Sequence, residues 1–61
     1  MWAGMTPAQR GQTLRNMQQF GGSFVKALAA AWLLADPAND QALGAAFPDI
    51  VVRYGSMGPA Q

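Results

Sequence analysis

The chain has 61 residues and contains neither cysteine nor histidine. A domain of this length buries only about 60% of the surface that its unfolded chain exposes, so its hydrophobic core alone gives marginal stability. Small domains commonly compensate with disulfides, a structural metal ion or association. Without cysteine there is no disulfide, and zinc loses its two best ligands. The sequence therefore predicts association, with a second copy or another molecule; a stable monomer is the alternative.

The composition is hydrophobic and sparsely charged, with 51% hydrophobic and 11% charged residues. Such a balance is opposite to that of intrinsically disordered chains, which combine low hydrophobicity with high net charge. The net charge of +1 gives little electrostatic steering. Nucleic-acid binders usually show a basic patch or stripe, whereas the basic residues here are spread along the chain: Arg10, Arg15, Lys26 and Arg53. A folded domain is expected, and nucleic-acid binding is not favoured.

The longest nearly apolar run extends from Phe24 to Ala35 and contains Lys26. It is shorter than the roughly 20 apolar residues that a membrane-spanning helix needs. The first residues, Met1 to Met5, lack the basic and apolar regions of a signal peptide. We expect neither a transmembrane span nor a signal peptide.

A first helix is predicted from Pro7 to about Gln19. Thr6 can cap its first amides, Pro7 suits the first helical position, and Gln9 can complete a capping box. The helix has a thin apolar stripe, which consists of Leu14, Met17 and Phe20.

The segment Gly21-Gly22-Ser23 is expected to separate this helix from the next. The glycines can form a left-handed cap and Ser23 can cap the following helix. One long helix with a kink at the glycines is the alternative. A phosphate-binding loop is not favoured, because the preceding strand and the Gly-Lys-Ser/Thr spacing are missing.

The second helix is predicted from Phe24 to Ala35 and is apolar nearly all round. Its broadest apolar face consists of Phe24, Leu28, Ala31, Trp32 and Ala35. A helix of this kind is normally buried on most sides. Because so short a chain offers little material to cover it, the pattern indicates a surface for a partner.

Asp36-Pro37 is expected to end the second helix and begin a third, from Pro37 to about Ala46. Asp40 falls in the first turn, where the helix dipole favours negative charge. The segment from Pro48 to Tyr54 is predicted as a short fourth helix, although its β-branched residues also suit an extended segment.

These elements predict an all-α fold with three to four short helices in a small bundle, completed by self-association or by a partner. Residues 1–61 form one domain, in which 1–5 and 55–61 are expected to be loose ends.

No catalytic, cofactor or metal site is predicted. Without histidine and cysteine, the usual nucleophile–base pairs are excluded. Ser23 and Lys26 are interpreted as a helix cap beside a solvated lysine, and Asp36 and Asp40 as a cap and a dipole partner. We expect neither an enzyme nor a small-molecule substrate.

Five large apolar residues are the candidate protein contacts: Trp2, Phe20, Phe24, Leu28 and Trp32. Tryptophan is enriched in binding hot spots, so Trp2 either anchors a partner or folds back onto the core. Trp32 suits the core or a subunit interface.

The chain resembles small uncharacterised proteins of tailed bacteriophages and prophages over about residues 14–54. The resemblance rests on Gln19–Ala29, Trp32, Ala35-Asp36, Ala45–Asp49 and Arg53-Tyr54. It implies a phage origin and a location in the cytoplasm of a host bacterium or in a virion, and it transfers no functional residue.

The leading hypothesis is a non-enzymatic, phage-type accessory protein that binds a host or viral protein and modulates a host protein. One alternative is a homo-oligomeric structural component of a virion. Another is a peripheral membrane-active peptide, although the chain has little charge to attract anionic lipid.

Overall fold

The computed structural model describes residues 2–57, and this part of the chain is all-helical. Its helices are α1 (Pro7–Phe20), α2 (Ser23–Leu33), α3 (Pro37–Ala46) and α4 (Pro48–Gly55). The predicted all-α fold of short helices is confirmed, and the segment that also suited an extended conformation is the helix α4. Residues 58–61 of the expected loose C-terminal end lie outside the described residues.

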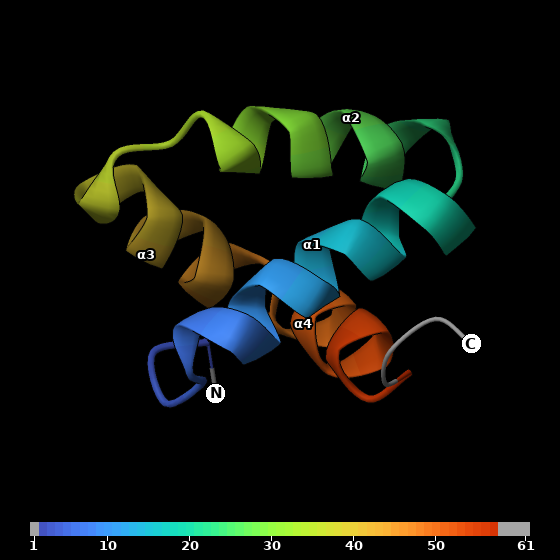
Figure 1. The fold of residues 1–61 in the computed structure, drawn as a ribbon. Coiled ribbons are helices and arrows are strands. Elements are labelled where there is room, and N and C mark those ends of the chain that lie inside the picture. Colours follow the sequence, from blue (N-terminus) through green and yellow to red (C-terminus); the bar gives the residue numbers. More distant parts are fainter. Residues whose placement is uncertain (1, 58–61) are drawn as a thin grey trace.

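Helix α1 occupies the centre of the fold, with α2 on one side and α4 on the other (Figure 1). Helix α3 closes one end of the fold, where it packs against α2 and α4. Helices α1 and α3 do not pack directly, and the N-terminal turn lies between them. The Trp2 carbonyl accepts a hydrogen bond from Arg10 of α1, and the Trp2 side chain packs against Gly44 of α3.

The predicted capping box of α1 is confirmed. Thr6 Oγ1 accepts a hydrogen bond from the Gln9 amide at 3.1 Å, and Gln9 Oε1 accepts one from the Thr6 amide at 2.8 Å. Pro7 takes the first helical position, where no amide donor is needed. Local chemistry therefore fixes where α1 begins.

The buried face of α1 differs from the predicted stripe, because it includes Thr13 and Asn16 whereas Phe20 is 51% exposed. The buried polar groups have partners. Thr13 Oγ1 donates to the Gln9 carbonyl at 2.8 Å, and Asn16 Nδ2 donates to the Tyr54 carbonyl at 2.9 Å. The latter bond ties α1 to α4 across the core.

The break at the paired glycines is confirmed, but its chemistry is not the predicted one. Gly21 is extended, with φ −77° and ψ 161°, so it forms no left-handed cap. A Cβ at Gly21 would lie 2.4 Å from Val25 Cγ1 and 2.5 Å from the Met17 carbonyl oxygen. Glycine is required here by a close approach. Ser23 is the first residue of α2 and does not cap the helix as predicted. The N-cap of α2 is Gly22, which makes no side-chain cap hydrogen bond.

Helix α2 ends at Leu33, two residues before the predicted Ala35. The amides of Leu34 and Ala35 bond three residues back, to the carbonyls of Ala31 and Trp32, and thereby tighten the last turn. Asp36 then caps α3 as predicted, since its Oδ1 accepts from the Asn39 amide at 2.8 Å.

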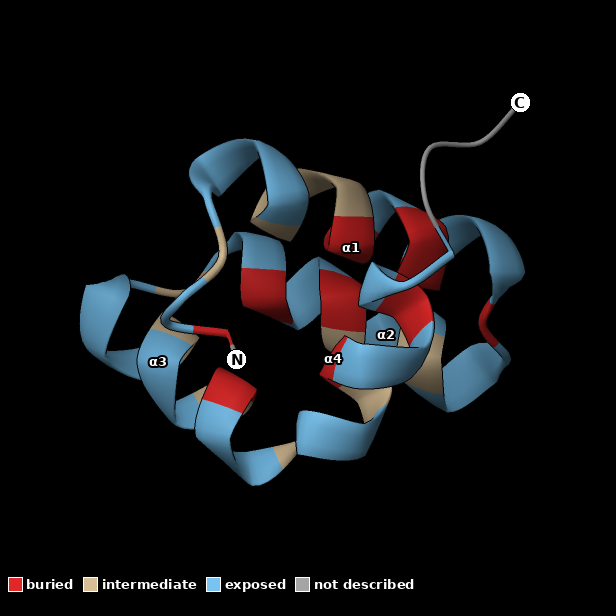
Figure 2. Ribbon diagram, turned by 90° about the horizontal axis from the view of Figure 1, so that it is seen from below, coloured by how far each residue is buried: buried red, intermediate tan, exposed pale blue. Residues whose placement is uncertain are grey.

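The hydrophobic core joins α1, α2 and α4 to the N-terminal turn (Figure 2). Its buried apolar residues are Trp2, Leu14, Met17, Ala29, Trp32, Val51 and Tyr54. The predicted loose N-terminal end is therefore wrong for residues 2–5. They form a turn in which the Met5 amide bonds to the Trp2 carbonyl at 3.1 Å, because Trp2 is 4% exposed and anchors the turn in the core.

Candidate protein-binding surface on helix α2

Two of the five predicted contact residues form the centre of the core. The rings of Trp2 and Trp32 are tilted by 48° with their centroids 4.7 Å apart, and Trp32 is 2% exposed. Trp32 Nε1 donates to Asp40 Oδ1 at 2.8 Å, which couples α2 to α3. In this fold neither tryptophan projects from the surface as an anchor for a partner.

Arg10 holds the N-terminal turn in place from α1. Its Nε donates to the Trp2 carbonyl at 3.0 Å and one terminal nitrogen donates to the Ala3 carbonyl at 3.1 Å. The guanidinium carbon also lies 5.7 Å from the centre of the Trp2 ring, a distance at which cation–π attraction contributes. On its other side, the Trp2 side chain rests on Gly44 of α3.

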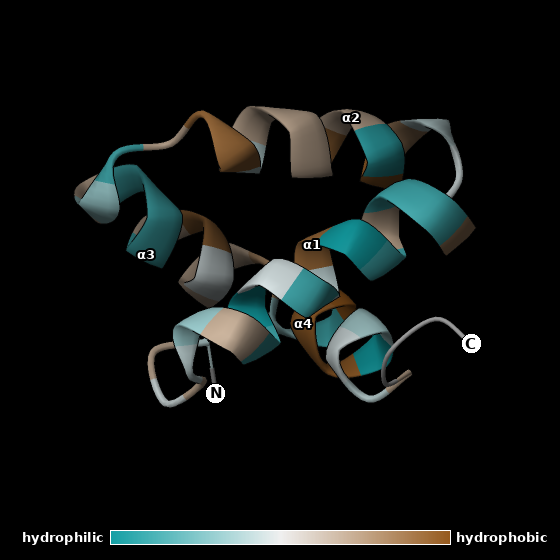
Figure 3. Cartoon of the chain, viewed as in Figure 1, coloured by the Kyte–Doolittle hydropathy of each residue, from teal (hydrophilic) through white to brown (hydrophobic). Residues whose placement is uncertain are grey.

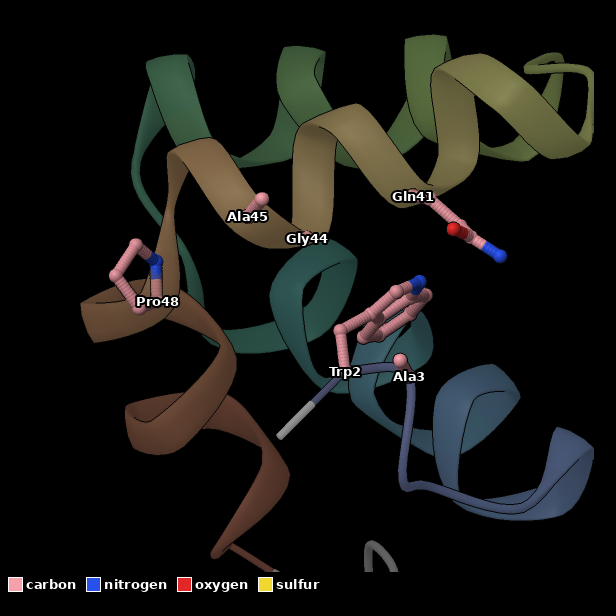
Figure 4. A pocket seen from close by; sticks show the side chains of 6 residues that line it. All are labelled: Trp2, Ala3, Gln41, Gly44, Ala45 and Pro48. Carbon is pink, nitrogen blue, oxygen red and sulfur yellow. The ribbon is translucent and has the colours of Figure 1, made fainter.

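A hollow of about 320 Å³ lies over Trp2. Its lining consists of Trp2, Ala3, Gln41, Gly44, Ala45 and Pro48 (Figure 4). Trp2 Nε1 has no hydrogen-bond partner among the described residues, and the Gln41 side chain lies beside the indole. Because no lining side chain is ionisable, the hollow offers apolar contact and hydrogen bonding but no acid–base chemistry.

The outer face of α2 is an apolar surface that the described part of the chain leaves uncovered. The inward side of this helix carries Val25, Leu28, Ala29 and Trp32, which are buried or partly buried. The outer face consists of Phe24, Ala27, Ala30, Ala31, Leu33 and Leu34, all exposed. Leu34 is 88% exposed, Phe24 61% and Leu33 57%. Figure 3 shows that hydrophobic colouring continues along most of α2.

The charge on this surface is small and localised. Lys26 is the one charged residue of α2 and is exposed near its N-terminal end. Asp36, also exposed, follows the C-terminal end of the helix. Between these two charges the outer face is uninterrupted apolar surface.

The remaining contact candidates lie in different environments. Leu28 is partly buried against the core, whereas Phe20 is exposed at the end of α1. The Phe24 ring lies 6.1 Å from the Phe47 ring and thus links the outer face to the junction of α3 and α4. Only Phe20 and Phe24 of the five candidates are exposed as contacts require.

Sequence reasoning missed Leu33 and Leu34 as candidates. Their signal was present, because both are leucines outside the stripe that packs inward, on a helix with few polar residues. Single exposed apolar residues are common in soluble proteins, whereas contiguous ones mark interaction sites. Their position beside Ala27, Ala30 and Ala31 makes them candidates.

Within residues 2–57, no group of three or more potential metal ligands is found, and no helix is long and apolar enough to cross a membrane. Comparisons of the chain with protein-family models, with curated proteins and with solved structures gave no match. The arrangement of its own residues therefore carries the functional argument.

Proposed function

We propose that this chain is a non-enzymatic, phage-type accessory protein that acts by binding another protein through the outer face of α2. The observation that carries the proposal is the division of the apolar residues. Both tryptophans close the core, while Phe24, Leu33 and Leu34 remain more than half exposed on one helix. The core is closed without these three side chains, although the Phe24 ring also contacts the Phe47 ring.

The energetics favour covering this face. Full burial of a leucine or phenylalanine side chain contributes about 1.5–3 kcal/mol. Scaled to their exposed fractions, Phe24, Leu33 and Leu34 together would contribute roughly 3–6 kcal/mol on docking. The three alanines add area without side-chain entropy cost. After the entropic cost of association, such a surface supports a specific but not extreme affinity.

The charge distribution favours a protein over a lipid bilayer as the partner. Helices that lie on anionic membranes carry several basic residues along their polar side, and α2 carries only Lys26. The resemblance to small phage proteins supports a setting in an infected bacterium or a virion. The partner in this proposal is a host or viral protein, or a second copy of the chain.

The substitution Ala30→Glu tests the proposal, because it places a charge at the centre of the outer face. Glutamate is a good helix former, so the exposed site tolerates it and folding is unaffected. We expect at least a tenfold loss of protein binding, measured by capture from bacterial extract and by self-association of the purified chain.

The matched control is Ala42→Glu, which makes the same change at an exposed alanine of α3. It should bind like the unmodified chain. Equal binding by both variants would show that the outer face of α2 is not the contact surface.

A further inference from the structure

The charges at the two ends of the outer face of α2 are opposite. Lys26 lies near the N-terminal end, and Asp36 lies just beyond the C-terminal end. The centre of the face is occupied by Ala30 and Ala31, both exposed. A surface with this order of charges is complementary to itself when turned end for end.

We propose that the occupant of this face is a second copy of the chain, docked so that the two α2 helices run antiparallel. This inference rests on the proposed function, since it identifies the partner of the same surface. A twofold axis between Ala30 and Ala31 sets the register. With a rise of 1.5 Å per residue, Lys26 lies about 7 Å from the axis along the helix. At the same end, Asp36 of the second copy follows the C-terminus of its own α2.

Side-chain sizes are complementary in the same register. Ala30 of each copy lies opposite Ala31 of the other, and Ala27 lies opposite Leu34. Small residues at the centre allow the helix axes to approach to about 8 Å. The large Leu34 side chain meets a small one, so the two faces interdigitate. Phe24 then lies beyond Leu34 of the second copy and covers the end of the interface.

Electrostatics select the antiparallel orientation over the parallel one. In a parallel pair both Lys26 side chains lie at one end of the interface and both Asp36 side chains at the other, so like charges share an end. In the antiparallel pair each ammonium lies near the C-terminal end of the other α2, where the helix dipole favours positive charge. The helix dipoles also oppose each other. Orientation is thus fixed by groups at the rim, while the apolar centre supplies affinity.

Because the chain contains no cysteine, single thiols report this geometry without interference. One sample carries Ala27→Cys and a ¹⁵N-labelled sample carries Leu34→Cys. The two are mixed and oxidised, and the disulfide-linked dimers are identified by mass spectrometry. Antiparallel docking predicts an excess of the mixed dimer over the statistical share. Light-scattering mass of the unmodified chain, from low micromolar concentration to about 1 mM, is measured alongside.

A concentration-dependent dimer that gives mainly the mixed disulfide supports the inference. A dimer that gives mainly like-with-like disulfides, or one that Ala30→Glu leaves intact, overturns it. A monomer at every concentration also overturns it. If that monomer still captures another protein in a manner sensitive to Ala30→Glu, the proposed function stands while the self-docking fails. If it captures none, both fail.

Discussion

Replacing Gly44 with alanine is expected to lower the free energy of unfolding by about 2 kcal/mol, although alanine is the better helix former. Propensity alone would stabilise α3 by about 1 kcal/mol. However, a Cβ at Gly44 would lie 2.4–2.5 Å from the Cβ, Cγ and Cδ1 atoms of Trp2. Overpacking of a core costs about 1–3 kcal/mol, and loss of a buried tryptophan about 3–5 kcal/mol. The steric effect therefore wins.

These contacts cannot relax cheaply, because they involve the base of the Trp2 side chain. Its carbonyl is held by Arg10 and its ring by Trp32. Thermal unfolding should show a melting temperature lower by roughly 8–16 °C. The matched control is Gly11→Ala in α1, where a Cβ would meet nothing within 4 Å. That variant should gain about 1 kcal/mol. Equal stabilisation by both substitutions would show that Trp2 does not rest on α3.

Replacing Trp32 with alanine should destabilise the fold more strongly than Gly44→Ala. Trp32 is 2% exposed, contacts the Trp2 ring and donates to Asp40. Truncating a buried tryptophan costs about 3–5 kcal/mol. A domain of 61 residues has a total stability of roughly 3–9 kcal/mol. We expect this loss to remove most of the stability, so that a large fraction of the chain is unfolded at 25 °C. Circular dichroism and urea titration measure this fraction.

The neighbouring Leu33 is the matched control, because its side chain is 57% exposed. Leu33→Ala should change the stability of the monomer by less than about 0.5 kcal/mol. Comparable losses at both positions would contradict the assignment of Trp32 to the core and Leu33 to the outer face.

Much of the fold was predictable because its helix boundaries are set by neighbouring residues. Thr6-Pro7 and Asp36-Pro37 each place a cap before a proline, and both begin helices where predicted. Pro48 also takes the first helical position of α4, although Phe47 before it makes no side-chain cap hydrogen bond. The β-branched run forms a helix because no strand among the described residues is available to pair with it. Caps and prolines at helix starts can be recognised in the sequence without tertiary information.

Features that depend on distant residues were not predictable. Trp2 closes the core only because Gly44 lacks a side chain and Arg10 holds the preceding turn. Asn16 is buried because the carbonyl of Tyr54 accepts its hydrogen bond from 38 positions away. Neither contact produces a periodic pattern of apolar residues in the sequence. The sequence therefore predicted a loose N-terminal end in place of the buried Trp2, and a thin apolar stripe on the first helix without the buried Asn16.

The candidate surface on α2 was predictable only in part, because its exposure depends on how distant residues pack. The surplus of apolar residues on α2 was evident, but the face that points inward could not be assigned from periodicity alone. Packing assigns Trp32 to the core and leaves Phe24 exposed. Leu34 was not among the predicted contact residues, yet it is the most exposed of the large hydrophobic residues described.

We propose that the core, with its two tryptophans, is closed and that the outer face of α2 is the contact surface. A dilution series of ¹H–¹⁵N spectra distinguishes the two regions, since backbone amides and both indole N–H groups are observed together. We predict that the amides of Ala27, Ala30, Ala31 and Leu34 shift with concentration while the indole resonances of Trp2 and Trp32 stay fixed. Shifts of the indole resonances with fixed α2 amides would show that the contact lies at the tryptophans and not on the outer face of α2.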